Sequence, residues 1–296
     1  MFALRSIRRW LALVILAAPA FADCCNNSIA VIAQLSGKAT VRAPGARALK
    51  TAAALDWLGD GETLEVAPRS QAVLILVNGH RYELSAGATL TVAANAAPKI
   101  TGTARELPAL PPIPRLAAVA AESAPTSGAG ALRGGGAMTG LYPRAGTLAL
   151  AEKVNLRYAA VPKTESYHVS LENETGMVLL NVTTESTEVP VDSAALQAGT
   201  RYSWRVRALR SGTEIAAGTE EFTTLSAENS LRREEFASAL GASPSSLAVI
   251  ADVDLRLGLI SEACDEFTEA LKQKPDDAVL RQALESARST LAGKAH

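Results

Sequence analysis

The feature that most limits how this chain can fold is a stretch rich in proline and glycine in its first half. Residues 96–140 hold six prolines, and a glycine run at residues 134–136 follows them. Such a composition buries too little apolar surface to order itself, so we predict an extended and then flexible linker over residues 96–140. The chain is therefore expected to fold as separate units on either side of this linker.

Residues 23–95 show the alternation of a small all-β unit. Polar and apolar side chains alternate at residues 38–42 and 62–66, and residues 72–77 form a continuous apolar run. Asn78-Gly79 follows this run and precedes another strand-like segment, which predicts a β-hairpin with a type I′ turn. The succession of strand and turn predicts one all-β domain.

Residues 141–226 predict a second all-β unit, a sandwich. Residues 167–171 and 202–208 alternate, and the second segment places Tyr202 and Trp204 on one face with arginines on the other. This pattern is typical of a half-buried antiparallel strand.

Residues 227–293 change to a helical pattern. Ser243 is placed as an N-cap with Pro244 at the first helical position, and Asp277 begins a further helix in the same way. A small α-helical bundle is predicted, with helices over residues 230–240, 244–257 and 278–291.

The N-terminus has the pattern of an export signal. Arg5, Arg8 and Arg9 precede an apolar run over residues 10–18, and Pro19-Ala20-Phe21-Ala22 ends it with small residues. The run is too short to span a bilayer, so a signal peptide over residues 1–22 is predicted. An amphipathic or anchor helix is the alternative. We expect a periplasmic or secreted protein, with association with the outer membrane left open.

The three cysteines do not form a disulfide framework. Cys24 and Cys25 lie just after the predicted cleavage point, and Cys264 lies far away in the sequence. A flexible terminus with two thiols is favoured, while lipidation and binding of a soft metal are the alternatives.

The balance of charge excludes some classes of partner. Lys and Arg number 29 against 30 Asp and Glu, so nothing indicates a nucleic-acid surface. No later segment has the length of a transmembrane helix.

No catalytic motif is recognised in the sequence. Neither a nucleophile elbow, a zinc-protease motif nor a phosphate-binding loop is found, and His80, His168 and His296 lack partners at ligand spacing. We therefore expect no enzyme activity, no cofactor and no metal, with an enzyme of unrecognised site as the remote alternative.

Acidic residues gather in the helical region. Helical phase places most of them on the outward face, so a solvated surface is predicted, and a rim for a basic partner is the alternative. These residues are Asp252, Asp254, Glu262, Asp265, Glu266 and Glu269.

The first β unit resembles the periplasmic FecR-type domain over roughly 65 residues. The resemblance lies in residues 35–41, 58–64, 70–76, 78–79 and 84–90, with Asn78 in place of the usual Asp. It implies a FecR-like β domain and an envelope location. The regulatory role of FecR proteins is not implied, since the anti-sigma segment and transmembrane helix of that family are not recognised here.

The second β unit resembles a fibronectin type III module. Residues 196–202 are similar to the run in which a tyrosine hydroxyl, here of Tyr202, closes the corner before a strand. Tyr158 stands where those modules usually carry tryptophan. The fold does not choose between a spacer and a ligand-presenting surface.

The helical region resembles a tetratricopeptide repeat, which consists of two antiparallel helices. The matching small, aromatic and proline positions are Leu247, Ala251, Gly258, Ala263, Phe267, Ala270 and Pro275. About one repeat with a half-repeat on each side leaves an open groove and an apolar end face.

Together these units predict a non-catalytic exported protein that binds or scaffolds other envelope proteins. Recognition of cell-wall or exopolysaccharide glycan is the alternative, although few aromatic residues are present for it. The groove is the expected contact surface. Its candidate contact residues are Leu247, Ile250, Asp254, Arg281 and Glu285.

Overall fold

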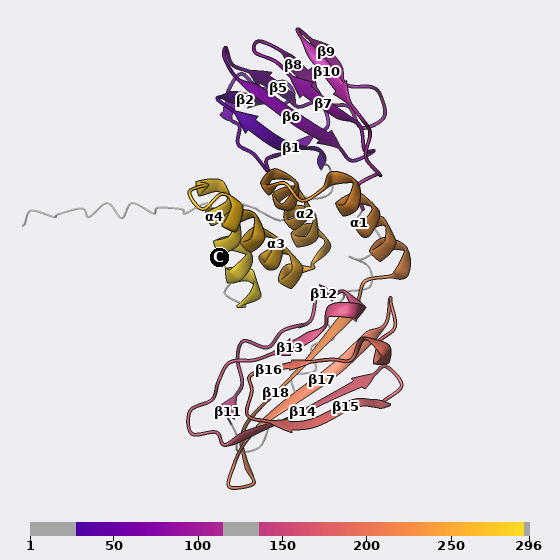
Figure 1. The fold of residues 1–296 in the computed structure, drawn as a ribbon, viewed down its shortest axis with the longest axis vertical. Helices are drawn as coiled ribbons and strands as arrows, with labels where there is room; N and C mark the ends of the chain where they lie inside the picture. Colours follow the sequence, from indigo (N-terminus) through magenta and orange to yellow (C-terminus); the bar gives the residue numbers. More distant parts are fainter. Residues whose placement is uncertain (1–27, 115–135, 293–296) are drawn as a thin grey trace, which may run out of the picture.

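The computed structural model describes residues 28–114 and 136–292 (Figure 1). The predicted signal peptide, Cys24, Cys25, His296 and part of the predicted linker lie outside the described residues. Two β units flank a helical region that lies between them. The predicted fold class, antiparallel sheets followed by a C-terminal helical bundle, is confirmed at this level.

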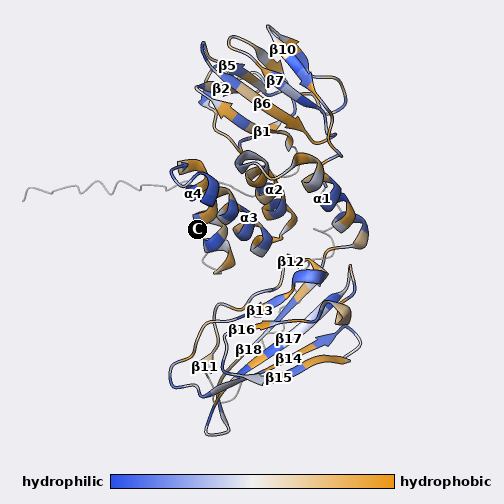
Figure 2. Cartoon of the chain, viewed as in Figure 1, coloured by the Kyte–Doolittle hydropathy of each residue, from blue (hydrophilic) through white to orange (hydrophobic). Residues whose placement is uncertain are grey.

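The first β unit is a pair of five-stranded antiparallel sheets around an apolar core. One sheet has the order β10-β7-β6-β1-β4, and the other has the order β3-β2-β5-β8-β9. Strands β1 and β6, which are adjacent in the first sheet, consist largely of hydrophobic residues (Figure 2). The strands are β1 (Ser28–Ser36), β2 (Ala39–Arg42), β3 (Lys50–Thr51), β4 (Trp57–Gly59), β5 (Thr63–Val66), β6 (Gln71–Leu76), β7 (Arg81–Leu84), β8 (Thr89–Thr91), β9 (Lys99–Thr101) and β10 (Ala104–Leu107).

The predicted hairpin joins β6 and β7, but its turn differs from the prediction. A type I′ turn needs positive φ at two residues, whereas here Gly79 has φ +90° and Asn78 does not. The Gly79 N–H donates to the Leu76 carbonyl at 2.9 Å, and the Leu76 N–H donates to the His80 carbonyl at 2.9 Å. The hairpin is therefore closed by a longer loop with glycine in the left-handed region.

The predicted linker is wrong for residues 99–113. Strands β9 and β10 lie there, and β10 pairs with β7 along four residues. Leu110 and Ile113 are buried, and the N–H of each donates to a backbone carbonyl of the β6–β7 loop. Apolar side chains between the prolines reach the core and so hold this segment in place. The first unit therefore extends about 20 residues beyond the predicted boundary at residue 95.

Gly79 provides a test of this docked segment. A Cβ atom at residue 79 would lie 2.0 Å from the Leu110 carbonyl oxygen. We expect Gly79→Ala to lower the free energy of unfolding by about 1–2 kcal/mol through the positive φ, and by roughly 1–3 kcal/mol more through this contact. Urea denaturation measures the change.

Gly87→Ala is the matched control, because Gly87 has φ +76° and open space around its Cβ position. Equal losses in the two variants would contradict close packing of Leu110 on the hairpin.

The second β unit is a sandwich of a large and a small sheet. The large sheet has the order β11-β18-β17-β14-β15, with β12 also pairing with β18, and β13 pairs with β16 in the small sheet. The strands are β11 (Gly136–Ala137), β12 (Leu148–Ala149), β13 (Asn155–Arg157), β14 (Ser166–Asn173), β15 (Val178–Thr184), β16 (Glu188–Pro190), β17 (Arg201–Arg210) and β18 (Thr213–Thr224), with short 3₁₀ turns η2 (Ala151–Lys153) and η3 (Ser193–Ala195).

The alternation predicted for β17 is confirmed. Tyr202 and Trp204 are buried, and the Tyr202 hydroxyl accepts from the Gln197 N–H at 2.6 Å. The Trp204 indole N–H donates to the Pro143 carbonyl at 2.8 Å. Each aromatic ring thus packs in the core while its polar atom is satisfied by the backbone.

The helical region has four helices: α1 (Ala227–Leu240), α2 (Pro244–Leu257), α3 (Ile260–Gln273) and α4 (Ala278–Leu291). The predicted caps are present. Ser243 accepts from the Ser246 N–H, and Asp277 accepts from the N–H groups of Val279 and Leu280. Gly258 ends α2 in the left-handed conformation that favours glycine.

One apolar cluster joins the three parts, and we call it the central cluster. It takes side chains from both β units and from α1 and α2, so α2 is buried against both units. Its buried members are Val31, Ala33, Ile75, Leu110, Ile113, Leu148, Leu150, Leu225, Phe236, Val249, Ile250, Val253, Leu257 and Leu259.

Candidate functional site

A cleft of about 620 Å³ lies between the first β unit and the helical region. One wall is the end of β1 with parts of β6 and β7, which follow it in the same sheet, and the other wall is formed by the first residues of α2 and α4. Such a volume is typical of ligand pockets. Its lining residues include Ala33, Gln34, Leu55, Gln71, Val73, Glu83, Ser245, Ala248, Lys274, Asp277, Val279 and Leu280.

Among the described residues, the end of β1 that lines the cleft has a pairing strand on one side only. Strand β4 pairs with β1 over Ser28–Val31, and the loop before β4 bonds Ile32. Residues 33–37 all line the cleft, so the backbone of β1 contributes to its surface. Within the described parts of the chain, residues 34–36 pair with β6 and with no second strand.

Some charged groups of the cleft have partners within the described part of the protein, and one does not. Glu83 is paired with Arg105 and accepts from the Gln71 amide, while Asp277 caps α4. Lys274 has no ion pair among the described residues. The Gln34 amide donates to the Ser245 hydroxyl at 2.7 Å across the cleft. The free charge of the cleft is therefore a cation at its helical wall.

Of the five predicted contact residues, some are accessible at the surface and others are buried. Arg281 and Glu285 are exposed on α4, and Leu247 is half-buried. Ile250 is buried in the central cluster and Asp254 is fully buried, so the prediction that these two contact a partner is wrong. The reason is that the first β unit and α1 cover the face of α2 that was expected to be open.

The predicted apolar end face is also absent from the described helices. Helix α4 buries Leu280, Leu284 and Ala287 against α3, and its exposed residues are mostly polar, with Val279 exposed where it lines the cleft. The last helix therefore covers the bundle instead of leaving it open.

The predicted solvated acidic surface is largely wrong. Asp254 has no exposed surface and Glu262 is 6% exposed, while Asp265 and Glu269 are at the surface. The helical periodicity of a sequence predicts which face is exposed to solvent only if other elements pack against a single side of the helix. Here α1 and the sandwich pack against the side that was assigned to solvent.

A contact between the first β unit and α2 was missed by sequence reasoning. The Trp57 indole N–H donates to an Asp252 carboxylate oxygen, and the Arg256 guanidinium lies 4.2 Å from the centre of the Trp57 ring. Arg256 also donates to Asp252 at 3.2 Å. Burial raises the pKa of Asp252, which Arg256 and Trp57 counteract. The spacing of Asp252 and Arg256, four residues apart on a helix, was the available signal.

A double-mutant cycle tests this contact. We expect Trp57→Phe and Asp252→Asn to show a coupling free energy of about 1–3 kcal/mol, because the hydrogen bond involves a charged acceptor. The measurement is denaturation of the four proteins at neutral pH. A coupling indistinguishable from zero would show that the contact does not hold the first unit on α2.

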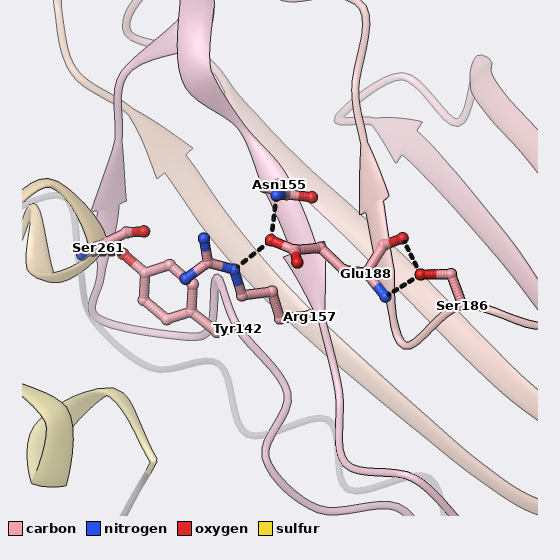
Figure 3. A network of polar contacts seen from close by, with 6 residues as sticks. All are labelled: Tyr142, Asn155, Arg157, Ser186, Glu188 and Ser261. Carbon is pink, nitrogen blue, oxygen red and sulfur yellow. Dashed lines mark hydrogen bonds and ion pairs between the residues drawn. The ribbon is translucent and has the colours of Figure 1, made fainter. Parts of the chain in front are cut away.

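The junction of α3 with the sandwich is polar. The Tyr142 hydroxyl accepts from the Ser261 N–H at 3.2 Å, and burial raises the pKa of Tyr142. Beside it, Glu188 accepts from Arg157 at 2.8 Å and from Asn155 (Figure 3). These contacts fix one edge of the sandwich next to the start of α3.

The remaining residues with possible chemistry do not converge. His80 pairs with Glu106 at 2.8 Å, His168 contacts Arg207, and burial raises the pKa of the Cys264 thiol to about 11. Within residues 28–114 and 136–292, no group of three His, Cys, Asp or Glu is placed to hold a metal ion. Each helix in the described part of the chain is too short to cross a membrane.

No protein-family model and no curated protein matches this chain.

Proposed function

We propose that this is a non-catalytic exported envelope protein that binds a segment of another envelope protein in the cleft between the first β unit and the helices. The observation that carries the proposal is the 620 Å³ cleft, whose walls offer a strand backbone, apolar side chains and the cation of Lys274. Binding along a strand edge and binding in a helical groove are both common modes of peptide recognition.

Three resemblances support this proposal. The first unit is similar to a FecR-type domain and the second to a fibronectin type III module, with the corner hydrogen bond of Tyr202. The helices are similar to a tetratricopeptide repeat, with buried small residues at Ala251, Ala263 and Ala270. Proteins built from such modules commonly connect other proteins.

Glycan binding remains the second candidate, and the cleft favours it less. Sugar-binding platforms use exposed Trp or Tyr, and neither residue type lines the cleft. The periplasmic or secreted location follows from the sequence pattern of residues 1–22 and is part of the proposal.

The test places a photo-crosslinking amino acid at Val279, which is 37% exposed and lines the cleft. Irradiated cell-envelope extract is expected to give an adduct with a protein. The same amino acid at Gln282, exposed on α4 outside the lining residues, is the control and is expected to give none.

A second variant tests whether the cleft itself is used. Val279→Arg narrows the cleft and is expected to reduce adduct formation from a probe at Ser245 by more than tenfold, which is a loss of about 1.4 kcal/mol in binding. Adducts with polysaccharide alone, or equal adducts at Val279 and Gln282, would contradict the proposal.

A further inference from the structure

Four charged side chains meet in the interior where α1, α2 and α3 approach the sandwich. Arg233 of α1 donates to both carboxylate oxygens of Asp254 on α2, at 2.8 and 2.5 Å, and to Glu266 of α3 at 2.6 Å. Glu262 of α3 lies beside them. These four residues form what we call the carboxyl clasp.

The clasp has more carboxyl groups than cations. Three carboxyl groups face one guanidinium group. Asp254 is also influenced by the positive charge of Lys153 in η2. Tyr142 and Cys264 face Glu262 and bring no positive charge. Arg157 acts on both of these groups, and Arg288 acts on Cys264. The excess of acid groups is therefore not balanced by salt bridges.

The carboxyl oxygens of the clasp that lack a donor in the described structure point to bound protons. Oε2 of Glu262 and Oε2 of Glu266 are buried, and each lacks a hydrogen-bond partner among the described residues. Both groups lie beside Asp254, whose charge adds to burial in raising the pKa of Glu262 and of Glu266. A buried carboxyl group beside another acid, with an oxygen that no donor reaches, is more stable with its proton bound than as a carboxylate.

We propose that the carboxyl clasp is a proton-operated switch. Bound protons keep α1 and the sandwich closed against α2 and α3, and release of these protons opens that seam. Besides the clasp, α1 is held by Phe236, which is buried in the central cluster, and by the Ser246 hydroxyl, which donates to the Leu240 carbonyl at 2.8 Å. The sandwich side is held near the clasp by the Leu148 N–H, which donates to the Gly258 carbonyl at 3.1 Å. The inference is independent of any ligand in the cleft.

The direction of the pH effect follows from where the protons are held. Burial raises the pKa of Glu262 to about 7 and that of Glu266 to about 8, from a usual value of 4.5. Between about pH 4.5 and about pH 8, the closed form therefore binds more protons than the open or unfolded form. Its stability is fully present below about pH 4.5 and is lost as the pH rises through 7 and 8.

The test is hydrogen exchange of the full mature chain, corrected for the intrinsic rate, between about pH 5.5 and about pH 9. We expect the opening constant for α1 and for residues 148–153 to rise by up to tenfold per pH unit for each proton released, and then to level off. The β1–β6 pair, which lies away from the clasp, is expected to stay protected.

Glu262→Gln with Glu266→Gln mimics the protonated side chains and is expected to keep the seam protected at about pH 9. Glu269→Gln is the control, because Glu269 is on the same helix, exposed and paired with Lys272. It is expected to keep the pH dependence of the wild type.

Two results would overturn the proposal. One is exchange of α1 that does not change with pH in the wild type. The other is a double variant that opens like the wild type. If the double variant does not fold, carboxyl ¹³C titration of the wild type gives the answer: midpoints for Glu262 and Glu266 near 7 and 8 support the switch, and midpoints below about 5 contradict it.

Discussion

The arrangement of this molecule depends on the burial of α2 between two β units. Val249, Ile250, Val253 and Leu257 of this helix belong to the same cluster as side chains of β1 and β6 and of the sandwich. Removal of apolar surface from water is the main favourable contribution to such an arrangement. The two β units are therefore held through a shared helix, and the first of them cannot move freely with respect to the second while this cluster is intact.

Polar contacts lie on two sides of the same helix and add direction to the apolar packing. Asp252 receives the Trp57 indole on the side of the first β unit, and Asp254 receives Arg233 on the side of α1. Buried ionic contacts contribute little net stability on average, but breaking one leaves a charge uncompensated and is costly. They therefore select one orientation of the parts among those that the apolar cluster alone would permit.

The sequence predicted the bounds of single helices well, but it predicted poorly which elements pack against one another. The bounds of α2 and α4 were predicted from Ser243-Pro244 and Asp277, because caps act within a few residues of the chain. The burial of Ile250 and Asp254 was not predicted, because helical phase does not reveal how many elements surround a helix. The same holds for Leu110 and Ile113, whose proline-rich context resembles a linker until the β6–β7 hairpin is there to receive them.

If the shared helix fixes the two β units relative to one another, the distance between them has a single value, which a distance distribution measures. Spin labels at Lys99→Cys in β9 and Glu174→Cys in the β14–β15 turn, in a chain with Cys24→Ser and Cys25→Ser, are suited to double electron–electron resonance. Both labelled positions are exposed. We expect one narrow distribution at about pH 5.5, where the carboxyl clasp holds its protons. A broad distribution, as expected for two units on a flexible linker, would contradict this expectation.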